Sequence, residues 1–445
     1  MKKLILENIS KLPSSFNRFF MILNQFPRLV YGSDYIKLSN KLKTEKYYNN
    51  EADLIKLINF CINEVPFYKK YKKVNSITEF KQQFDFINKE IVSDHFEDFK
   101  ANSLDDNKFE IVTTGGTGGN PLKLLVPKNR YIVELAVMHG MWNRVGFNHH
   151  TRAVIRNQKI DNRKDYVINP ITKEVIFDGF RLNEAYYLKI YDVIKKFKIQ
   201  YIHAYPSAAY EFSKVLYKHN LDVSFIKSFL SGSENIYKYQ KNFIENQLKI
   251  PFYNWYGHSE KLVLGGYCKG TDHYHIESRY GYFELIDENG KPINTPGEIG
   301  EIVGTTINNF GMPLIRYRTD DFAEYVGEYC DICKKKGVLI KNIQGRWSGN
   351  KIYGADGSAV TSTALNFHDD LYLHIDGLQY VQNKMGIVDI LVIKNEKFTN
   401  ETHIRLKTYY ESKFSSDTVI NIRYVNALTK KPNGKFVELI SEIEE

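Results

Sequence analysis

Hydrophobic and polar positions divide the chain into a helical first quarter and an alternating middle. Up to about residue 105, apolar residues recur at helical spacing, as at Leu54, Ile58 and Cys61. A helix with this spacing would bury one face and expose the other. Pro66 ends it, because proline breaks the helical hydrogen-bond ladder. We therefore expect residues 1–105 to form an N-terminal helical region.

Beyond residue 128, helical stretches alternate with short apolar runs. The predicted helices are 129–142, 184–197, 208–217 and 237–248, and the predicted strands between and after them are 200–204, 228–230 and 251–255. Ser207 is the expected N-cap of the helix that follows it. Repeated units of this kind predict a mainly parallel sheet with helices on its faces. Ligands of such sheets bind at the carboxyl ends of the strands.

The pattern changes again near residue 280. Short strands at 282–286 and 300–305 predict a β-rich subdomain, and a strand, helix and strand at 387–393, 401–414 and 419–425 predict a small separate unit. The predicted fold is α/β: a large N-terminal domain with mainly parallel sheets flanked by helices plus a β-rich subdomain, and a small α+β C-terminal lid. The predicted divisions are 1–105, 106–345 and 346–445.

Composition narrows the class of protein. The chain has 445 residues, of which 43% are hydrophobic and 25% charged, as in an ordinary globular protein. The net charge is +9 and the basic residues are scattered, so nucleic-acid binding is not the first interpretation. An anionic small ligand fits this charge equally well, and so does no charged partner at all. Glu7 and Asn8 interrupt the apolar start, unlike a cleavable signal, and we find no apolar run of about 18 residues that would cross a membrane. We expect a cytoplasmic protein.

A glycine-rich stretch, TTGGTGGNP over residues 113–121, lies between two strand-like runs at 109–112 and 122–126. Glycine N–H groups and threonine hydroxyls can hold phosphate oxygens. The stretch is not a Walker loop, because no Gly-Lys-Ser/Thr follows the glycines. A plain hairpin turn is the alternative reading.

The motifs downstream of this stretch decide between these readings. In chain order they are HAYPS at 203, SGSE at 231, YGHSE at 256, GEIGEIVGT at 297, YRTDD at 317, GR at 345 and NGK at 433. Their order and spacing resemble the adenylate-forming enzymes, which include acyl-CoA synthetases and peptide-synthetase adenylation domains. Within these, the chain looks like phenylacetate–CoA ligase and its CapK-like capsule-biosynthesis branch. The resemblance covers about residues 60–440.

The resemblance implies an ATP- and Mg²⁺-dependent ligase in which a carboxylate attacks the α-phosphate, expels pyrophosphate and becomes an acyl adenylate. Residues 106–345 would then be the AMP-binding core. The implied phosphate-binding residues are Thr113, Thr114, Gly116, Thr117 and Gly118, and the implied adenine-site residues are Gly232, Ser233 and Tyr256. Glu234 and Gly257 are implied as further nucleotide-binding residues, and those at the ribose are Asp321 and Arg346.

The same resemblance assigns the catalytic roles. Ser259 would reach the α-phosphate, and Glu260 would hold Mg²⁺, which prefers carboxylate and phosphate oxygens. His203, with Tyr205 and Pro206, would border the acyl pocket. Lys435 would place a positive charge on the carboxylate and α-phosphate.

Three departures from the family pattern stand out. Asn120 occupies a position that usually carries Lys, for which Lys123 is the candidate substitute, and Asp320 replaces a glycine before the ribose carboxylate. The usual hinge Asp is absent after Arg346, which leaves Gly349 as the candidate hinge.

The cysteines suggest a metal site. Two residues separate Cys330 from Cys333, and Cys268 is followed closely by His273 and His275. This ligand set is typical of tetrahedral zinc. By resemblance, some relatives of phenylacetate–CoA ligase carry a similar site. We expect structural Zn²⁺ on Cys268, His273, Cys330 and Cys333, with His275 as the alternative ligand; reduced free thiols are the other reading.

The acceptor of the acyl group stays open. If the acceptor is an amine, the product is an amide. The acid would then be carried on a uronic sugar nucleotide, for a surface polysaccharide such as capsule or O-antigen. If the acceptor is coenzyme A, the product is a thioester. A third reading is a catalytically silent nucleotide-binding protein. The altered hinge and the capsule-type resemblance favour the amine. The pattern leaves a homodimer open.

Overall fold

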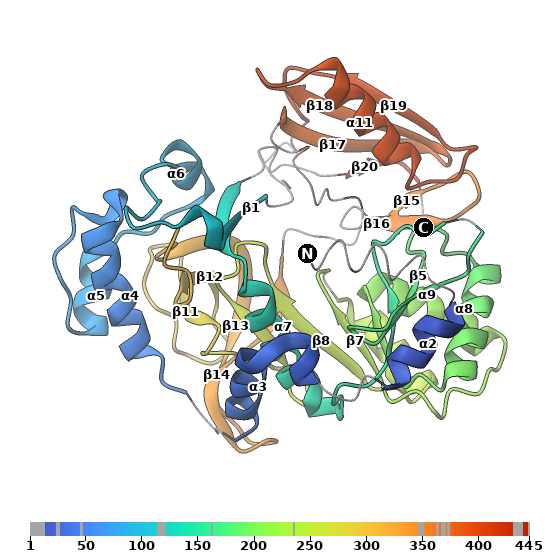
Figure 1. Cartoon of the computed structure of the whole chain (residues 1–445), viewed down its shortest axis with the longest axis horizontal. Helices are drawn as coiled ribbons and strands as arrows, with labels where there is room; N and C mark the ends of the chain where they lie inside the picture. Colours follow the sequence, from blue (N-terminus) through green and yellow to red (C-terminus); the bar gives the residue numbers. More distant parts are fainter. Residues whose placement is uncertain are drawn as a thin grey trace.

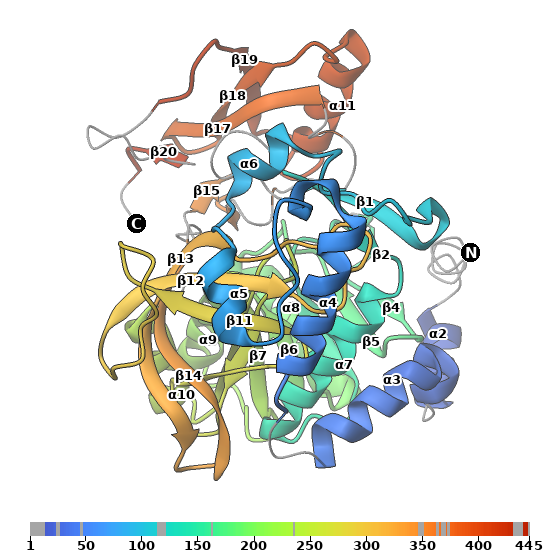
Figure 2. The ribbon, with the colours of Figure 1, turned by 90° about the vertical axis from the view of Figure 1, so that its left-hand side faces the viewer.

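The computed structural model describes residues 14–23, 27–44, 48–113, 122–161, 163–234, 236–345, 351–361, 365, 371, 374–429 and 439–443. Figure 1 shows a large body built on one broad sheet, with a smaller C-terminal unit lying above it. The same arrangement is visible after a quarter turn in Figure 2.

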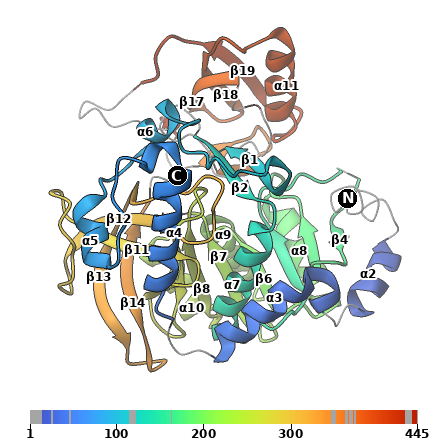
Figure 3. The ribbon, with the colours of Figure 1, turned by 60° about the vertical axis from the view of Figure 1, so that its left-hand side comes forward.

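Helices make up most of the first hundred residues, as predicted. They are α2 (Ser14–Leu23), α3 (Pro27–Thr44), α4 (Glu51–Glu64), α5 (Ile77–Gln83) and α6 (Lys89–Asp94), with a 3-10 turn at Pro66–Tyr68. In α4 the side chains of Leu54, Ile58 and Cys61 are fully buried, which confirms the predicted apolar face. Figure 3 shows α2 and α3 on the side of the body away from the C-terminal unit.

A twelve-stranded sheet forms the body, in the order β11-β12-β13-β14-β10-β9-β8-β7-β6-β3-β5-β4. Its first half comprises β3 (Arg152–Ile155), β4 (Val167–Asn169), β5 (Glu174–Phe177), β6 (Tyr201–Ala204), β7 (Ser228–Gly232) and β8 (Phe252–Gly257). The pairs β5–β3, β3–β6, β6–β7 and β7–β8 are all parallel. The predicted parallel section is therefore confirmed.

Helices join these strands as the pattern predicted. They are α7 (Arg130–Trp142), α8 (Glu184–Phe197), α9 (Pro206–Lys218) and α10 (Lys238–Gln247), with short 3-10 helices at Asp106–Lys108 and Asn143–Val145. Ser207 is not the N-cap of α9. The helix begins at Pro206, two residues before the predicted start at 208, because the fixed φ of proline suits the first helical position. Ser207 therefore lies in the first turn.

The second half of the sheet is antiparallel and continues the same sheet. It comprises β9 (Leu264–Tyr267), β10 (Tyr274–Ile276), β11 (Gly281–Ile286), β12 (Ile299–Thr306), β13 (Tyr317–Cys330) and β14 (Lys335–Gln344). The direction reverses between β8 and β9, where Trp255 pairs with Gly266. The sheet is thus mixed, because the predicted β-rich strands join the parallel ones edge to edge.

Two strands outside the sheet frame the glycine-rich stretch. β1 (Phe109–Thr113) pairs antiparallel with β2 (Lys123–Pro127), and their last partners are Thr113 and Lys123. Side chains of directly paired residues leave the same face of a ladder, so Lys123 lies on the side of Thr113.

The C-terminal unit has its own four-stranded sheet, in the order β19-β18-β17-β20. Its elements are β15 (Lys351–Tyr353), β16 (Ala359–Thr361), β17 (Ile375–Lys384), β18 (Ile387–Lys394), α11 (Asn400–Glu411), β19 (Val419–Tyr424) and β20 (Leu439–Ser441). A new sheet here fits the predicted boundary at residue 345, and that division of the chain stays a prediction.

The C-terminal unit packs on the parallel half of the body. Its buried residues, such as Ile352 and Tyr380, belong to the same hydrophobic cluster as Phe177 and Phe212. Across the described residues, no helix has both the length and the apolar character needed to cross a bilayer.

Candidate active site

Three neighbouring parallel strands have their carboxyl ends on the same side of the sheet. β6 ends at Ala204, β7 at Gly232 and β8 at Gly257, and each is followed by a motif residue. Gly232 pairs with Trp255, and a Cβ at Gly232 would come within 2.6 Å of the indole ring. Only glycine therefore permits this approach, which brings the SGSE and YGHSE segments against each other.

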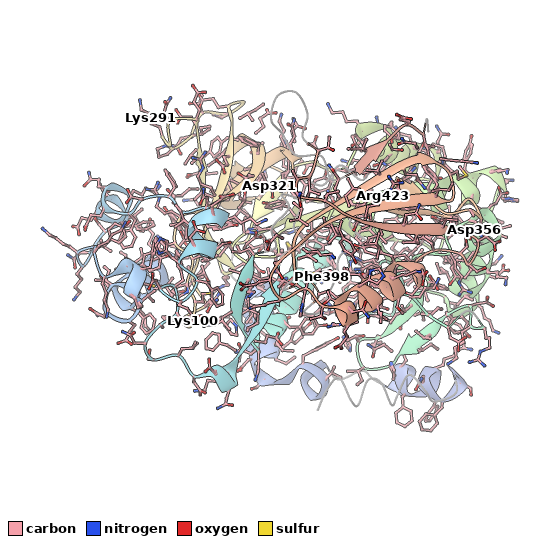
Figure 4. All side chains as sticks on the ribbon, turned by 90° about the horizontal axis from the view of Figure 1, so that it is seen from above. Lys100, Lys291, Asp321, Asp356, Phe398 and Arg423 are labelled. Carbon is pink, nitrogen blue, oxygen red and sulfur yellow. The ribbon has the colours of Figure 1, made fainter. Side chains whose placement is uncertain are left out.

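Tyr256 and Asp321 meet across the sheet. The Tyr256 hydroxyl donates a hydrogen bond of 2.8 Å to Asp321 Oδ2, although 65 residues separate them. Burial, and then the Asp321 charge, raise the pKa of Tyr256 well above its usual value, so the phenol stays protonated as a donor. Asp321 is 7% exposed. The residues expected at adenine and ribose are therefore in contact; Figure 4 labels Asp321 as seen from above.

The residue before Asp321 explains one departure from the family pattern. Asp320 has φ of 58°, in the left-handed region that glycine adopts without strain. Aspartate is among the few other residues that tolerate this conformation. The backbone turn is thus kept although the glycine is replaced.

Glu260 is held by two side chains. Its Oε2 lies 3.0 Å from His258 Nδ1, and its Oε1 accepts from the Tyr317 hydroxyl at 3.3 Å. His258 Nε2 accepts the backbone N–H of Val263 at 3.0 Å, so a neutral His258 carries its proton on Nδ1 and donates it to Glu260. The His258 and Glu260 side chains are 7% and 4% exposed. This arrangement fixes a buried carboxylate of the kind that binds Mg²⁺.

His258 was missed by the sequence reasoning, although it lies within a motif that was recognised. The missed signal is the position of His258, which directly follows β8 and comes two residues before the carboxylate of Glu260.

A second group of side chains surrounds Arg156, directly after β3. Its Nη1 donates to His203 Nε2 at 2.7 Å, its Nη2 donates to Ser233 Oγ at 2.9 Å, and its guanidinium lies 4.4 Å above the Tyr205 ring. Burial, and then the Arg156 charge, lower the pKa of His203 well below its usual value. His203 is therefore neutral. Arg156 also escaped the sequence analysis, because no motif marks it.

Tyr205 and Ser207 line a cavity of about 770 Å³ between α8, α9 and the β15–β16 hairpin. Ser207 donates its backbone N–H and its hydroxyl to Glu234 Oε2, at 3.2 and 2.7 Å. Glu234 thus connects the end of β7 to the first turn of α9. The volume falls within the roughly 300–1,000 Å³ typical of small-molecule sites.

Away from these groups, three cysteines and one histidine converge between β9, β10 and β13. The ligand atoms of Cys268, His275, Cys330 and Cys333 all lie within 4.8 Å of one another. Cys268 and Cys330 Sγ are 3.7 Å apart, and Cys333 Sγ is 3.4 Å from His275 Nε2. A tetrahedral zinc ion with bonds of about 2.3 Å to sulfur separates its sulfur ligands by about 3.7 Å, so this group fits zinc.

The fourth residue of this group is His275, the alternative ligand, and not the expected His273. His275 belongs to β10 and is fixed by pairing with β9 and β14. His273 precedes the strand, in the turn that closes on Cys268, and its ring lies 3.6 Å from Asp272 instead.

The remaining predicted site residues divide into two groups. Ser259 is exposed beside Glu260, and Thr113 ends β1. The predictions for Thr114, Gly116, Thr117, Gly118, Arg346 and Lys435 lie outside the described residues.

The fold of the chain is similar to that of solved acyl-CoA ligases. Among solved structures, 2-hydroxyisobutyryl-CoA ligase in complex with 2-HIB-AMP and CoA in the thioesterification state is similar with a TM-score of 0.57 and 13% identity, covering 94% of this chain and 92% of that one. Its postadenylation state with R3-HIB-AMP gives 0.54 and 12%, covering 88% of each chain. The predicted fold class is confirmed.

A narrower relationship comes from the sequence. Residues 352–442 match the CapK C-terminal domain family. Protein CapK of Staphylococcus aureus is 23% identical over 434 residues, which covers 92% of this chain and 90% of that protein. The resemblance to the CapK-like branch of the adenylate-forming superfamily is confirmed.

Proposed function

We propose that the chain is a ligase that uses ATP to activate a carboxylic acid as an acyl adenylate. The observation that carries the proposal is the pairing of Tyr256 with Asp321 beside the buried Glu260, at the carboxyl ends of the strands. In open α/β sheets this edge is where ligands bind. Solved ligases with this fold hold acyl-AMP compounds.

Each residue has a role in this chemistry. Asp321 accepts the ribose hydroxyls, and Tyr256 lies against the base. Glu260, oriented by His258, holds Mg²⁺, which offsets negative charge on the phosphates. The acid's carboxylate oxygen then forms a bond to the α-phosphorus while the bond to pyrophosphate breaks. The protein contributes mainly position and electrostatic stabilisation. Ser259 near the α-phosphate, Lys435 near the carboxylate and the threonines from Thr113 onward stay predictions for this step.

Exchange of labelled pyrophosphate into ATP tests the proposal. Purified protein with Mg²⁺ and a panel of carboxylic acids is expected to support exchange with at least one acid. Exchange that stays at background for every acid, in protein shown by calorimetry to be folded, would contradict it and would favour the silent nucleotide-binding reading.

For the acceptor, we propose an amine, and hence amide formation in the assembly of a surface polysaccharide, with the acid carried on a uronic sugar nucleotide. The relationship to CapK supports a capsule-related role. Coenzyme A is the second candidate, because the related solved ligases were captured with CoA. Supplying amines and CoA separately to the adenylating enzyme distinguishes the two by product mass.

We further propose structural Zn²⁺ on Cys268, His275, Cys330 and Cys333. A closed set of four protein ligands is typical of structural rather than catalytic zinc. Protein purified without added metal is expected to contain about one zinc per chain, and Cys330→Ser with Cys333→Ser to lose it and melt at lower temperature. Cys61→Ser is the matched control, because Cys61 is buried in α4 far along the chain from this group. Wild-type protein without zinc would overturn the assignment.

A further inference from the structure

The Arg156 guanidinium has only neutral neighbours among its described contacts. They are the imidazole of His203, the hydroxyl of Ser233 and the ring of Tyr205. No carboxylate of the described chain lies within ion-pair distance of it. Arg156 is half-buried. A half-buried cation without a counter-ion is unfavourable, because it loses hydrating water and the neutral groups around it compensate for only part of that loss.

The cavity that Arg156 lines is positive as a whole. Its described lining contains four basic side chains, Arg156, Lys214, Lys218 and Lys351, and two acidic ones, Glu184 and Glu211. The lysines are already paired. Lys214 and Lys351 lie 2.7 and 3.2 Å from Glu211, and Lys218 lies 2.8 Å from Glu184. The three lysines share two carboxylates, so Arg156 is the basic residue of this described lining that has no carboxylate within ion-pair distance.

The donors around Arg156 also exceed the acceptors. Its two described hydrogen bonds use one hydrogen of each terminal nitrogen, whereas a guanidinium has five N–H donors. His203 accepts from Arg156 through Nε2, so its proton is on Nδ1, and this buried atom has no partner in the described chain. A ligand with several acceptor oxygens would satisfy these groups.

The Arg156 backbone is closely packed against a neighbouring segment. Gly179, after the neighbouring strand β5, packs so closely that a Cβ on it would come within 1.5 Å of the Arg156 carbonyl oxygen. Gly179 N–H also binds the Gln158 carbonyl at 2.9 Å. A fixed backbone lets a fork-shaped guanidinium recognise an anion with defined geometry.

Building on the proposed function, we infer that the acid activated here carries a second anionic group, a carboxylate or a phosphate, which binds Arg156 in the 770 Å³ cavity between α8, α9 and the β15–β16 hairpin. Arg156 is thus a specificity-determining residue for the acid, although it also donates a hydrogen bond to Ser233, one of the residues implied at the adenine. A small acid without a second anionic group would leave the guanidinium unpaired once its own carboxylate has reacted.

Matched pairs of acids test this inference in the exchange assay. Butyrate is compared with glutarate, and glucuronate with its 1-phosphate and with UDP-glucuronate. The dianionic member of a pair is expected to have at least a tenfold higher kcat/KM than its partner. The two arms separate a carboxylate from a phosphate as the bound anion. Equal or better use of butyrate and glucuronate, which lack a second anionic group, overturns the inference.

Arg156→Met and Arg156→Lys identify the residue. We expect Arg156→Met to lower kcat/KM for the dianionic acid by about 10- to 100-fold, the range for losing a charge-assisted hydrogen bond. The KM for ATP and the kcat/KM for the monoanionic acid should change less than about threefold, and Arg156→Lys should restore part of the loss. Equal losses for both acids and for ATP would mean a structural role and would contradict the inference.

The control is Lys189→Met, which removes one exposed positive charge of α8 that is paired with Asp165. It should leave all three parameters unchanged. Calorimetric titration of the same acids separates this inference from the proposed function. If no acid supports exchange, adenylation fails, but dianion binding that Arg156→Met abolishes would still sustain the inference. Absence of dianion binding would overturn it.

Discussion

At the proposed nucleotide end of the candidate site, neighbours within the chain hold the side chains to which we assign a function. At the proposed acid end, the Arg156 guanidinium lies among neutral groups. Tyr256 donates to Asp321, and His258 and Tyr317 hold Glu260. Arg156 instead contacts an imidazole, a hydroxyl and an aromatic ring. The first end is preorganised for one ligand before it arrives. The second requires its ligand to supply the missing charge.

The largest effect is expected at the nucleotide end. Glu260→Gln and Asp321→Asn remove the charges proposed to hold Mg²⁺ and ribose, and each should lower the rate of pyrophosphate exchange by about 10²- to 10³-fold. Glu324→Gln is the matched control, because Glu324 is also on β13 but pairs with Lys341. Near-normal exchange in Glu260→Gln or Asp321→Asn would remove the contrast between the two ends.

His258 should show a smaller effect, through the carboxylate it orients. His258→Phe keeps a ring but removes the donor to Glu260, and we expect exchange to fall about 10- to 100-fold. The Mg²⁺ concentration for half-maximal rate should rise. A loss of rate with unchanged Mg²⁺ dependence would instead indicate that His258 serves only to pack the site.

Tyr256→Phe tests the hydroxyl separately from the ring. Asp321 loses one hydrogen bond that the neutral phenol donates to its carboxylate, and its other contacts remain, so KM for ATP should rise by about tenfold. Tyr256→Ala should do more, since it also removes the aromatic face. If both variants lose the same amount, only the hydroxyl matters.

The smallest effect concerns pH at the acid end. The folded protein holds His203 neutral, because its pKa in the folded state lies well below the value of about 6.5 in the unfolded chain. Its contribution to stability is complete above about pH 6.5 and is lost as pH falls toward the folded pKa, by at most about 1.4 kcal/mol per pH unit. His203→Gln keeps an acceptor for Arg156 and should flatten the decrease of melting temperature between pH 6.5 and 5. An unchanged slope would show that other groups cause it.

The sequence predicted the nucleotide end better than the acid end, for a physical reason. Tyr256, Glu260 and Asp321 lie in short motifs at the ends of periodic strands, so local spacing locates them. The Arg156 contacts depend on β3, a strand of four residues that the pattern did not reveal. Its partners lie 47 and 77 residues further along the chain. Long-range strand order, which local periodicity does not encode, creates that group.

Smaller differences have equally local causes. Both His273 and His275 follow Cys268 at suitable spacing, and only the strand pairing of β10 selects His275. Ser207 is a good capping residue by type, but Pro206 begins the helix before it. The β-rich strands were predicted, whereas their union with the parallel strands depends on the turn from β8 to β9.

The β15–β16 hairpin contributes Lys351, Tyr353, Gly357 and Ala359 to the wall of the cavity, so one wall belongs to a different unit from the rest. Linked equilibria are reciprocal. If contact between this hairpin and α9 raises the affinity of the cavity for a compound, then binding of that compound must stabilise the contact by the same free energy. Slower deuterium uptake at the amides of residues 351–361 would then report occupancy without any turnover.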